Sequence, residues 1–153
     1  MCHANGLIKQ SEAFKSIPYL DSDNKLHYGF GSLCPPHCSK INESQASRKM
    51  NHHLNTIVRT WMKKNIKVHL DMRQKMALES LIYNVGVGGY ANSKSHRYLN
   101  KGYYERAAQE FLSFNKITKI KRLKSGRIIK IKVLSRGLVK RRVAEYKFWM
   151  GIK

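Results

Sequence analysis

The sequence predicts an α+β fold that is mostly helical, with a small antiparallel sheet near the N-terminus and a basic hairpin near the C-terminus. Three observations support this prediction. Turn-forming residues and alternating apolar residues fill 16–32, apolar residues then recur with helical spacing over most of the chain, and alternation returns within 115–134. The chain has 153 residues, the length of one domain or of two small lobes that share a core, and 42% of them are hydrophobic, which is enough for a packed interior.

The N-terminal part combines a short helix with a hairpin. Apolar residues within 6–15 predict the helix. Turn formers gather at 21–24, between segments rich in aromatic and aliphatic residues, and 26–30 alternates as a strand does. We therefore expect an antiparallel hairpin with its turn near 21–24, within a small β lobe over 16–42.

A long helix is predicted to connect this β lobe to the rest of the chain. Asn42 and Gln45 have the spacing of a capping box, and apolar residues form one stripe over 43–64. Residues 65–153 are expected to form a helical lobe that carries the basic hairpin. Its helices are predicted over 71–85, where glycines end the helix, and over 93–99, 103–114 and 138–150.

Positive charge is the strongest feature of the composition. The chain has 30 Lys and Arg against 9 Asp and Glu, a formal net charge of +21. Residues 116–142 hold twelve of these cations and no acid, and alternation predicts a basic hairpin over about 116–134. Such a surface is attracted to polyanions, and charge alone does not distinguish nucleic acid from anionic bacterial surfaces.

Several other features restrict the class of protein. No run approaches the roughly 20 apolar residues of a membrane span, and residues 1–10 lack the pattern of a secretory signal. The protein is therefore expected in a cytoplasm until something releases it. The cysteines are odd in number, so Cys2, Cys34 and Cys38 are expected to be reduced thiols. Their spacing does not match a zinc site, and neither a metal nor a cofactor is predicted.

Carboxylates are scarce, and only Glu12, Asp21 and Asp23 precede residue 43. Hydrolysis of a glycosidic bond requires an acid that protonates the leaving oxygen and a second group that stabilises positive charge or delivers water. The end of a helix packed against a hairpin can hold Glu12 and Asp21 across a cleft. Spacing alone is weak evidence, because two carboxylates nine positions apart are common.

Short segments follow one another in the order found in one enzyme family: EAFK at 12–15, YLD at 19–21, YGFG at 28–31, INESQA at 41–46, LIYNVGVG at 81–88 and GLVKRR at 137–142. This series resembles the phage-type lysozymes of glycoside hydrolase family 24. The resemblance implies a lysozyme-like fold with 1–153 as one domain. It also implies cleavage of the β-1,4 bond between N-acetylmuramic acid and N-acetylglucosamine, usually with inversion.

The same resemblance implies roles for individual residues. Glu12 is the implied general acid, and Asp21 is the implied carboxylate that activates water or stabilises positive charge on the sugar. In the family, an arginine of the last helix pairs with a carboxylate of the first helix. Arg141 or Arg142 is expected to make this pair, and the sequence does not decide between them.

One catalytic position departs from the family. His27 stands six residues after Asp21, where the family has threonine. An imidazole can accept a proton near neutral pH or attack the sugar carbon, whereas a hydroxyl can only hold a water. We hypothesise that His27 assists Asp21, either as a base in an inverting reaction or through a covalent intermediate with retention. The alternative is a surface strand residue without a catalytic role.

Further residues are expected to line the cleft or to fill the core. Tyr83 and Asn84 fall where the family lines its sugar cleft, and Asn84 either binds an acetamido group or caps its helix. The histidines at 52–53 are adjacent, so they point to different sides of a helix and are expected at the surface. Trp61 and Trp149 lie on or beside apolar stripes and are expected in the core.

The resemblance also implies partners and location. A monomer that acts on bacterial peptidoglycan is expected, accumulating in the host cytoplasm and reaching the cell wall through a holin pore. Its basic surface is expected to engage anionic wall polymers or lipopolysaccharide. Nucleic acid is not expected, because no recognition motif is found and no aromatics are interleaved with the basic cluster. A cationic protein that disrupts membranes or walls without catalysis stays an alternative.

Overall fold

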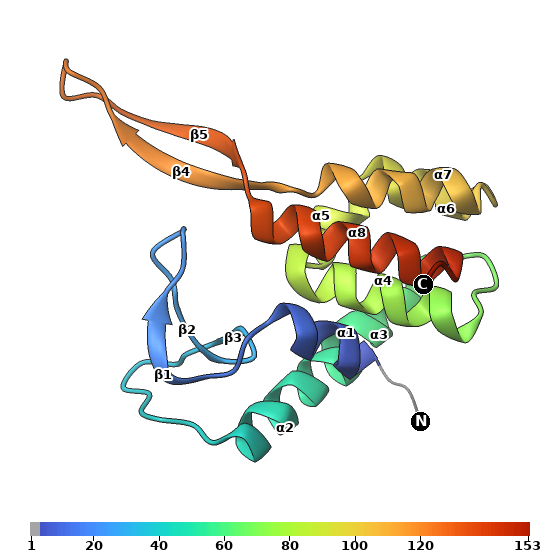
Figure 1. Ribbon diagram of the computed structural model, residues 1–153, viewed down its shortest axis with the longest axis horizontal. Helices are drawn as coiled ribbons and strands as arrows, with labels where there is room; N and C mark the ends of the chain where they lie inside the picture. Colours follow the sequence, from blue (N-terminus) through green and yellow to red (C-terminus); the bar gives the residue numbers. More distant parts are fainter. Residues whose placement is uncertain (1–3) are drawn as a thin grey trace.

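The computed structural model describes residues 4–153, and it confirms a mostly helical α+β architecture (Figure 1). The described part opens with a short helix and a three-stranded sheet, continues through a long helix, and ends in a helical lobe from which a two-stranded arm projects. Cys2, one of the three cysteines of the sequence, lies outside the described residues.

The first helix is shorter than the sequence predicts. Helix α1 (Ala4–Ser11) was expected to continue to residue 15, but the chain turns just after Ser11. It turns there because Lys15 already pairs with Gly29 in the first sheet, so pairing between strands overrides the local preference for helix. As a consequence, Glu12 stands one residue beyond the helix rather than within it.

The first sheet is a small antiparallel meander in the order β1-β2-β3, which forms the β lobe. Tyr19 lies opposite His27 in its register, and residues 21–25 form the turn that follows β1. The turn is closed by the N–H of Asp21, which donates to the carbonyl of Lys25 at 2.9 Å. The strands are β1 (Lys15–Leu20), β2 (Leu26–Gly29) and β3 (Ser32–Leu33).

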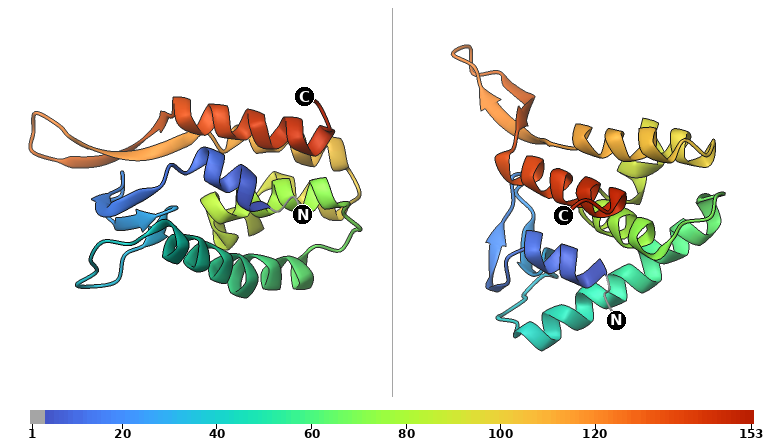
Figure 2. Two further views of the ribbon diagram at one scale, coloured as in Figure 1. Left: turned by 60° about the horizontal axis from the view of Figure 1, so that its bottom comes forward. Right: turned by 45° about the vertical axis from the view of Figure 1, so that its right-hand side comes forward.

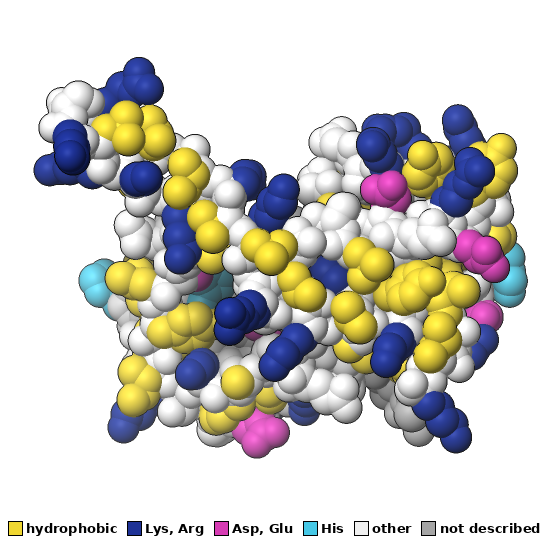
Figure 3. All heavy atoms as spheres, turned by 45° about the horizontal axis from the view of Figure 1, so that its top comes forward, with side chains coloured by type: hydrophobic (Ala, Val, Ile, Leu, Met, Phe, Trp, Pro, Cys, Tyr) yellow, Lys and Arg dark blue, Asp and Glu magenta, His cyan; other side chains and the backbone are white. Residues whose placement is uncertain are grey.

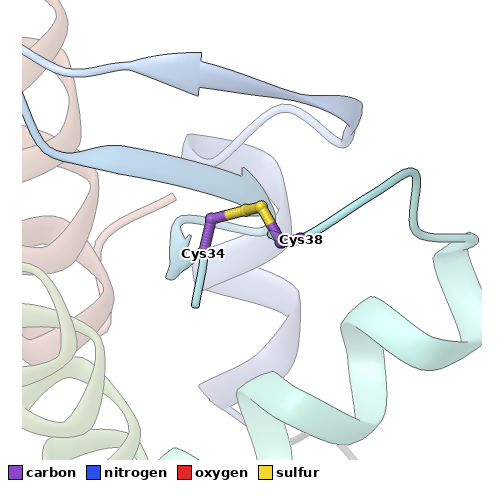
Figure 4. The surroundings of a disulfide bond; sticks show 2 residues. All are labelled: Cys34 and Cys38. Carbon is purple, nitrogen blue, oxygen red and sulfur yellow. A yellow bond between two sulfur atoms is a disulfide. The ribbon is translucent and has the colours of Figure 1, made fainter. Parts of the chain in front are cut away.

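A disulfide between Cys34 and Cys38 corrects the expectation of reduced thiols for this pair (Figure 4). The reason is a local turn that counting cysteines does not reveal. His37 adopts a positive φ of 64°, and the N–H of Cys38 donates to the carbonyl of Pro35 at 3.0 Å. The turn brings the two Cα atoms within 5.8 Å, which is inside the range of disulfides.

The long helix that links the β lobe to the helical lobe is continuous but not uniform. It begins with the predicted capping box, in which Asn42 and Gln45 exchange hydrogen bonds. A five-residue π-helical segment lies in its middle. Its segments are α2 (Glu43–His53), η1 (Leu54–Val58) and α3 (Arg59–Asn65). One buried stripe follows its length: Ala46, Met50, Leu54, Val58 and Met62.

The helical lobe is organised around a buried central helix, α4 (Met72–Val85), which packs against α1 and α8 (Figure 2). The glycines after α4 were expected to end this helix, and Gly86 does so, whereas the short helix that follows was not predicted. Gly86, with a φ of 82°, ends α4, but the next residue starts a further short helix. The other helices are α5 (Val87–Ala91), α6 (Lys94–Asn100), α7 (Tyr104–Gln109), η2 (Glu110–Ser113) and α8 (Arg136–Met150).

The basic hairpin forms as predicted and projects from the helical lobe as an arm (Figures 1 and 2). Strands β4 (Lys116–Arg122) and β5 (Ile128–Leu134) pair without a bulge along their whole length. At the root of the arm, the N–H of Ser135 donates to the carbonyl of Asn115, directly before Ser135 caps α8.

Candidate active site

A cleft of about 1360 Å³ is bounded by the β lobe, the long helix, the end of α4 and the root of the hairpin. In Figure 3 a recess opens below the projecting arm, with acidic and histidine side chains in its depth. The expected site residues Glu12, Asp21, His27, Tyr83 and Asn84 all line this cleft. The tertiary structure therefore brings together residues from the turn after α1, from the β1–β2 hairpin and from the core helix α4.

Glu12 is held in the cleft by an arginine from the last helix. The Arg141 Nη1 atom donates a hydrogen bond of 2.5 Å to Glu12 Oε1. The Glu12 side chain is 23% exposed, whereas that of Arg141 is only 5% exposed. On the other side, a Cβ atom at Gly31 would lie 3.3 Å from Glu12 Oε2, so the absence of a side chain at Gly31 leaves room for the carboxylate.

Arg141 is itself fixed by a buried polar network between α8 and α4. Its Nε atom donates to Glu145 Oε1 at 3.2 Å, and the Ser80 hydroxyl donates to the same oxygen at 2.6 Å. Glu145 also pairs with Arg142, whose Nε atom lies 2.9 Å from Glu145 Oε2. Burial lowers the pKa of Arg142 to about 10, so it stays charged at neutral pH. Partnered charges of this kind hold a buried arginine in one orientation.

Asp21 is surrounded by donors. Its Oδ1 atom accepts the N–H groups of Asp23 and Lys25, both at 2.8 Å, and its Oδ2 atom lies 2.8 Å from His27 Nε2. Partial burial raises the pKa of Asp21, but the two N–H groups and the neighbouring imidazole outweigh it and bring the pKa below its ordinary value. Asp21 is therefore ionised throughout the neutral range.

His27 is clamped between two acceptors. Its Nδ1 atom lies 3.0 Å from the carbonyl oxygen of Gly31, and its Nε2 atom faces Asp21. A carbonyl can only accept, so the Nδ1 contact is a hydrogen bond when Nδ1 carries a proton, and the Nε2 contact with Asp21 is an ion pair when the ring is charged. The ring is 18% exposed and stands opposite Tyr19 in the sheet register. His27 is thus a cleft residue in contact with Asp21, rather than an isolated surface residue of the strand.

Tyr83 and Asn84 present one polar group each near the end of α4. The Tyr83 hydroxyl donates to the carbonyl of Phe30 at 2.8 Å, and burial raises the pKa of Tyr83 to about 12, so the phenol stays neutral. The Asn84 Oδ1 atom accepts from Arg142 Nη2 at 3.1 Å. That contact orients the Asn84 amide from the core side, while the residue also borders the cleft.

Three features of the site were not found from the sequence. Arg141 was not distinguished from Arg142, because the register of α8 against Glu12 is a tertiary property. His53, expected only at the surface, is exposed but also packs edge-on against Tyr83 at 5.4 Å between ring centroids. The third is the root of the hairpin, which contributes Lys116, Ile117, Thr118 and Lys132 to the cleft.

The two tryptophans lie away from the cleft lining. Trp149 is buried as expected, and Trp61 is partly buried against Tyr90 and His96. Within residues 4–153, no cluster of three His, Cys, Asp or Glu side chains could hold a metal ion. Over the same residues, the helices are too short or too polar to cross a membrane.

Comparison with protein families assigns the chain. The family model described as phage lysozyme matches residues 9–145, which include both carboxylates and Arg141. The chain belongs to the phage lysozyme family. Among solved structures, this phage lysozyme family member is similar to an endolysin from Escherichia coli O157:H7 phage FAHEc1, with 26% identity and a TM-score of 0.78, over 96% of this chain and 90% of the other. The muramidase domain of SpmX from Asticaccaulis excentricus shares the fold, with 20% identity, a TM-score of 0.79, and coverage of 96% and 94%.

Curated relatives of this phage lysozyme family member are longer proteins. An endolysin of Bacillus phage B103 is 33% identical over 137 residues, which are 89% of this chain and 46% of the relative. An endolysin of Bacillus phage PZA is 33% identical over 108 residues, which are 70% of this chain and 41% of the relative. The chain therefore spans less than half the length of either relative.

Proposed function

We propose that this protein hydrolyses the β-1,4 bond between N-acetylmuramic acid and N-acetylglucosamine in bacterial peptidoglycan and so acts as an endolysin. The observation that carries the proposal is one cleft that holds two differently supported carboxylates, Glu12 beside Arg141 and Asp21 beside His27. Membership of the phage lysozyme family and the endolysin names of its relatives support it. We assign the protein to glycoside hydrolase family 24 on the same basis.

In the proposed reaction, Glu12 is the general acid that protonates the leaving oxygen. Arg141 engages Glu12 Oε1 and fixes the side chain, and Oε2 is the oxygen nearer Gly31. Asp21 is the ionised partner that stabilises positive charge on the sugar or orients the attacking water. The lowered pKa of Asp21 keeps it charged for this role. Tyr83 and Asn84 are proposed to contact the sugar.

We propose that His27 acts through Asp21. Because both ring nitrogens face acceptors, the geometry supports an orienting and charge-stabilising role more than that of a free base or nucleophile. Replacement of His27 by threonine tests this role. If His27 orients Asp21, the variant should react more slowly than wild type and release the same anomer first. A changed anomer would instead indicate a covalent intermediate on His27 in wild type. An unchanged rate and anomer would exclude any catalytic role.

The central test compares Glu12→Gln with Glu105→Gln, a change of the same kind on the exposed surface of α7. We expect purified peptidoglycan to be cleaved by wild type and Glu105→Gln but not by Glu12→Gln. Mass spectrometry should find reducing muramic acid ends in the products, because water is the acceptor. Anhydro ends would indicate a lytic transglycosylase and contradict the proposed hydrolysis.

The basic arm favours one second candidate, a cationic protein that disrupts membranes or walls without catalysis. Lysis of chloroform-permeabilised cells separates the two functions. Lysis by wild type but not by Glu12→Gln supports the enzyme, and equal lysis by both supports membrane disruption. For the enzyme, we further propose a monomer that is released from the host cytoplasm through a holin and held to the wall by anionic polymers.

A further inference from the structure

The β4–β5 hairpin has two faces that differ in charge. Residues directly opposite each other in an antiparallel pair point to the same side, and the side alternates along each strand. The register Lys116↔Leu134 and Ile117↔Val133 therefore separates the two faces. The first, here called the cleft-side face, consists of Lys116, Thr118, Ile120, Arg122, Ile128, Lys130, Lys132 and Leu134. The second, here called the outer face, consists of Ile117, Lys119, Lys121, Ile129, Ile131 and Val133.

The cleft-side face continues the wall of the cleft. Its first members, Lys116, Thr118 and Lys132, line the same cavity as Glu12, together with Ile117 at the root of the arm. The Lys132 ammonium donates to the Thr118 hydroxyl at 2.8 Å, across the two strands. A polymer that lies in the cleft can therefore pass directly onto this face of the hairpin.

Charge along the face is dense and of one sign. Lys116, Arg122, Lys130 and Lys132 all lie on the cleft-side face, whereas the outer face has two lysines. No acidic residue occurs in the sequence between Glu110 and Glu145 to neutralise them. A seven-residue strand extends about 24 Å, so the cations form a row rather than a point. Figure 3 shows Lys and Arg side chains gathered on the free end of the arm.

We propose that the cleft-side face binds the phosphodiester backbone of an anionic polymer attached to the glycan strand in the cleft. This inference rests on the proposed function. A row of cations is complementary to a polymer whose negative charges repeat at regular intervals. The isolated carboxylates of a peptide would pair with only one cation of the row at a time. The face begins inside the cleft, where a flat membrane surface cannot reach, so lipid phosphate is a poorer occupant than a flexible polymer.

Two double variants separate the effect of the cleft-side face from the effect of net charge. Arg122→Gln with Lys130→Gln removes two exposed cations from the cleft-side face, beyond the residues that line the cleft. Lys119→Gln with Lys121→Gln removes two exposed cations from the outer face at the same level of the arm. Both variants lower the net charge equally, so a difference between them reports the face and not the total charge.

Cleavage is measured as kcat/KM on cell walls with their phosphodiester polymer intact and on the same walls after its removal with hydrofluoric acid. On intact walls we expect kcat/KM of the cleft-side variant to be roughly fivefold lower than that of wild type. A plot of log kcat/KM against log salt concentration should also be less steep for this variant, by about 1 to 2. The outer-face variant should match wild type, and all three proteins should be equal on stripped walls.

Three outcomes overturn the proposal: equal losses in the two variants, a loss that persists on stripped walls, and no loss in either variant. Competition identifies the source of phosphate. Soluble teichoic acid should inhibit cleavage of intact walls more than phosphatidylglycerol vesicles of equal phosphate content, and equal inhibition would assign the face to lipid. Sedimentation with walls of the same variants in a Glu12→Gln background measures binding without cleavage. The proposed binding by the cleft-side face can therefore be tested even if the protein does not hydrolyse peptidoglycan.

Discussion

Arg141 and Glu12 are 129 positions apart in the sequence, and Arg141 Nη1 donates to Glu12 Oε1 at 2.5 Å. The contact ties the last helix to the first turn after α1, and it places a charged donor beside the proposed acid. Arg141 is held in turn by hydrogen bonds to Glu145 and to the Ser80 carbonyl. The position of Glu12 is thus determined by the core of the helical lobe.

Replacement of Arg141 by lysine should reduce activity more than stability. Lysine keeps the positive charge but loses the planar fork that contacts Glu12, Glu145 and the Ser80 carbonyl together. We expect kcat to fall about 100-fold, as for loss of one fixed polar group in an active site. Steady-state kinetics on purified peptidoglycan measure this, with Arg136→Lys on the exposed start of α8 as control. Equal kinetics in the two variants would contradict a positioning role for Arg141.

Replacement of Gly31 by alanine should displace Glu12. Gly31 has a φ of 81°, and an added Cβ would lie 3.3 Å from both Glu12 Cδ and Oε2. Gly102 has a nearly equal φ of 80° with no atom within 4 Å of the added Cβ, so Gly102→Ala is a control for backbone strain alone. Both variants should lose about 1 kcal/mol of unfolding free energy. Only Gly31→Ala should lose activity, by about tenfold or more, in the same peptidoglycan assay.

Asp21 should make stability depend on pH in the acid range. Its pKa in the folded protein lies below the ordinary value of 3.8, so its charged form is favoured by folding. The resulting stabilisation is complete above the unfolded pKa and is lost as the pH falls through the folded pKa. The unfolding free energies of wild type and Asp21→Asn, measured by thermal unfolding, should therefore differ by a constant amount at neutral pH. Below about pH 3.8 the stability of wild type relative to Asp21→Asn should decrease. Parallel curves down to the lowest pH would argue against the lowered pKa.

The disulfide between Cys34 and Cys38 should stabilise the segment that leads from β3 into α2. It closes a loop of only five residues, for which loop-closure entropy predicts about 2 kcal/mol. Denaturant unfolding of wild type should therefore shift to lower denaturant when a reductant is added. The Cys34→Ser variant with Cys38→Ser should match reduced wild type and should not respond to reductant. A reductant effect that persists in this variant would place the sensitivity elsewhere.

The sequence by itself determined the class of fold, the helical stripes and the basic hairpin. These features are local, because apolar periodicity, the Asn42 and Gln45 capping box and strand alternation are set by neighbours within a few residues. The ordered motifs also selected both carboxylates, which do line one cleft. The end of α1 and the start of α5 were not predicted, because strand pairing at Lys15 and the backbone turn at Gly86 override local preference.

Only the tertiary structure decided which groups face one another. The choice of Arg141 over Arg142 depends on the rotation of α8 against α4, and a rotation by one residue exchanges their roles. The contact of His27 with Asp21 depends on the register of β1 and β2. Likewise, the sequence shows that the hairpin is basic, but the register of its two strands decides which of its residues lie on the face that continues the cleft. Contacts between distant segments arise from packing, and sequence periodicity specifies only which side of each element is buried.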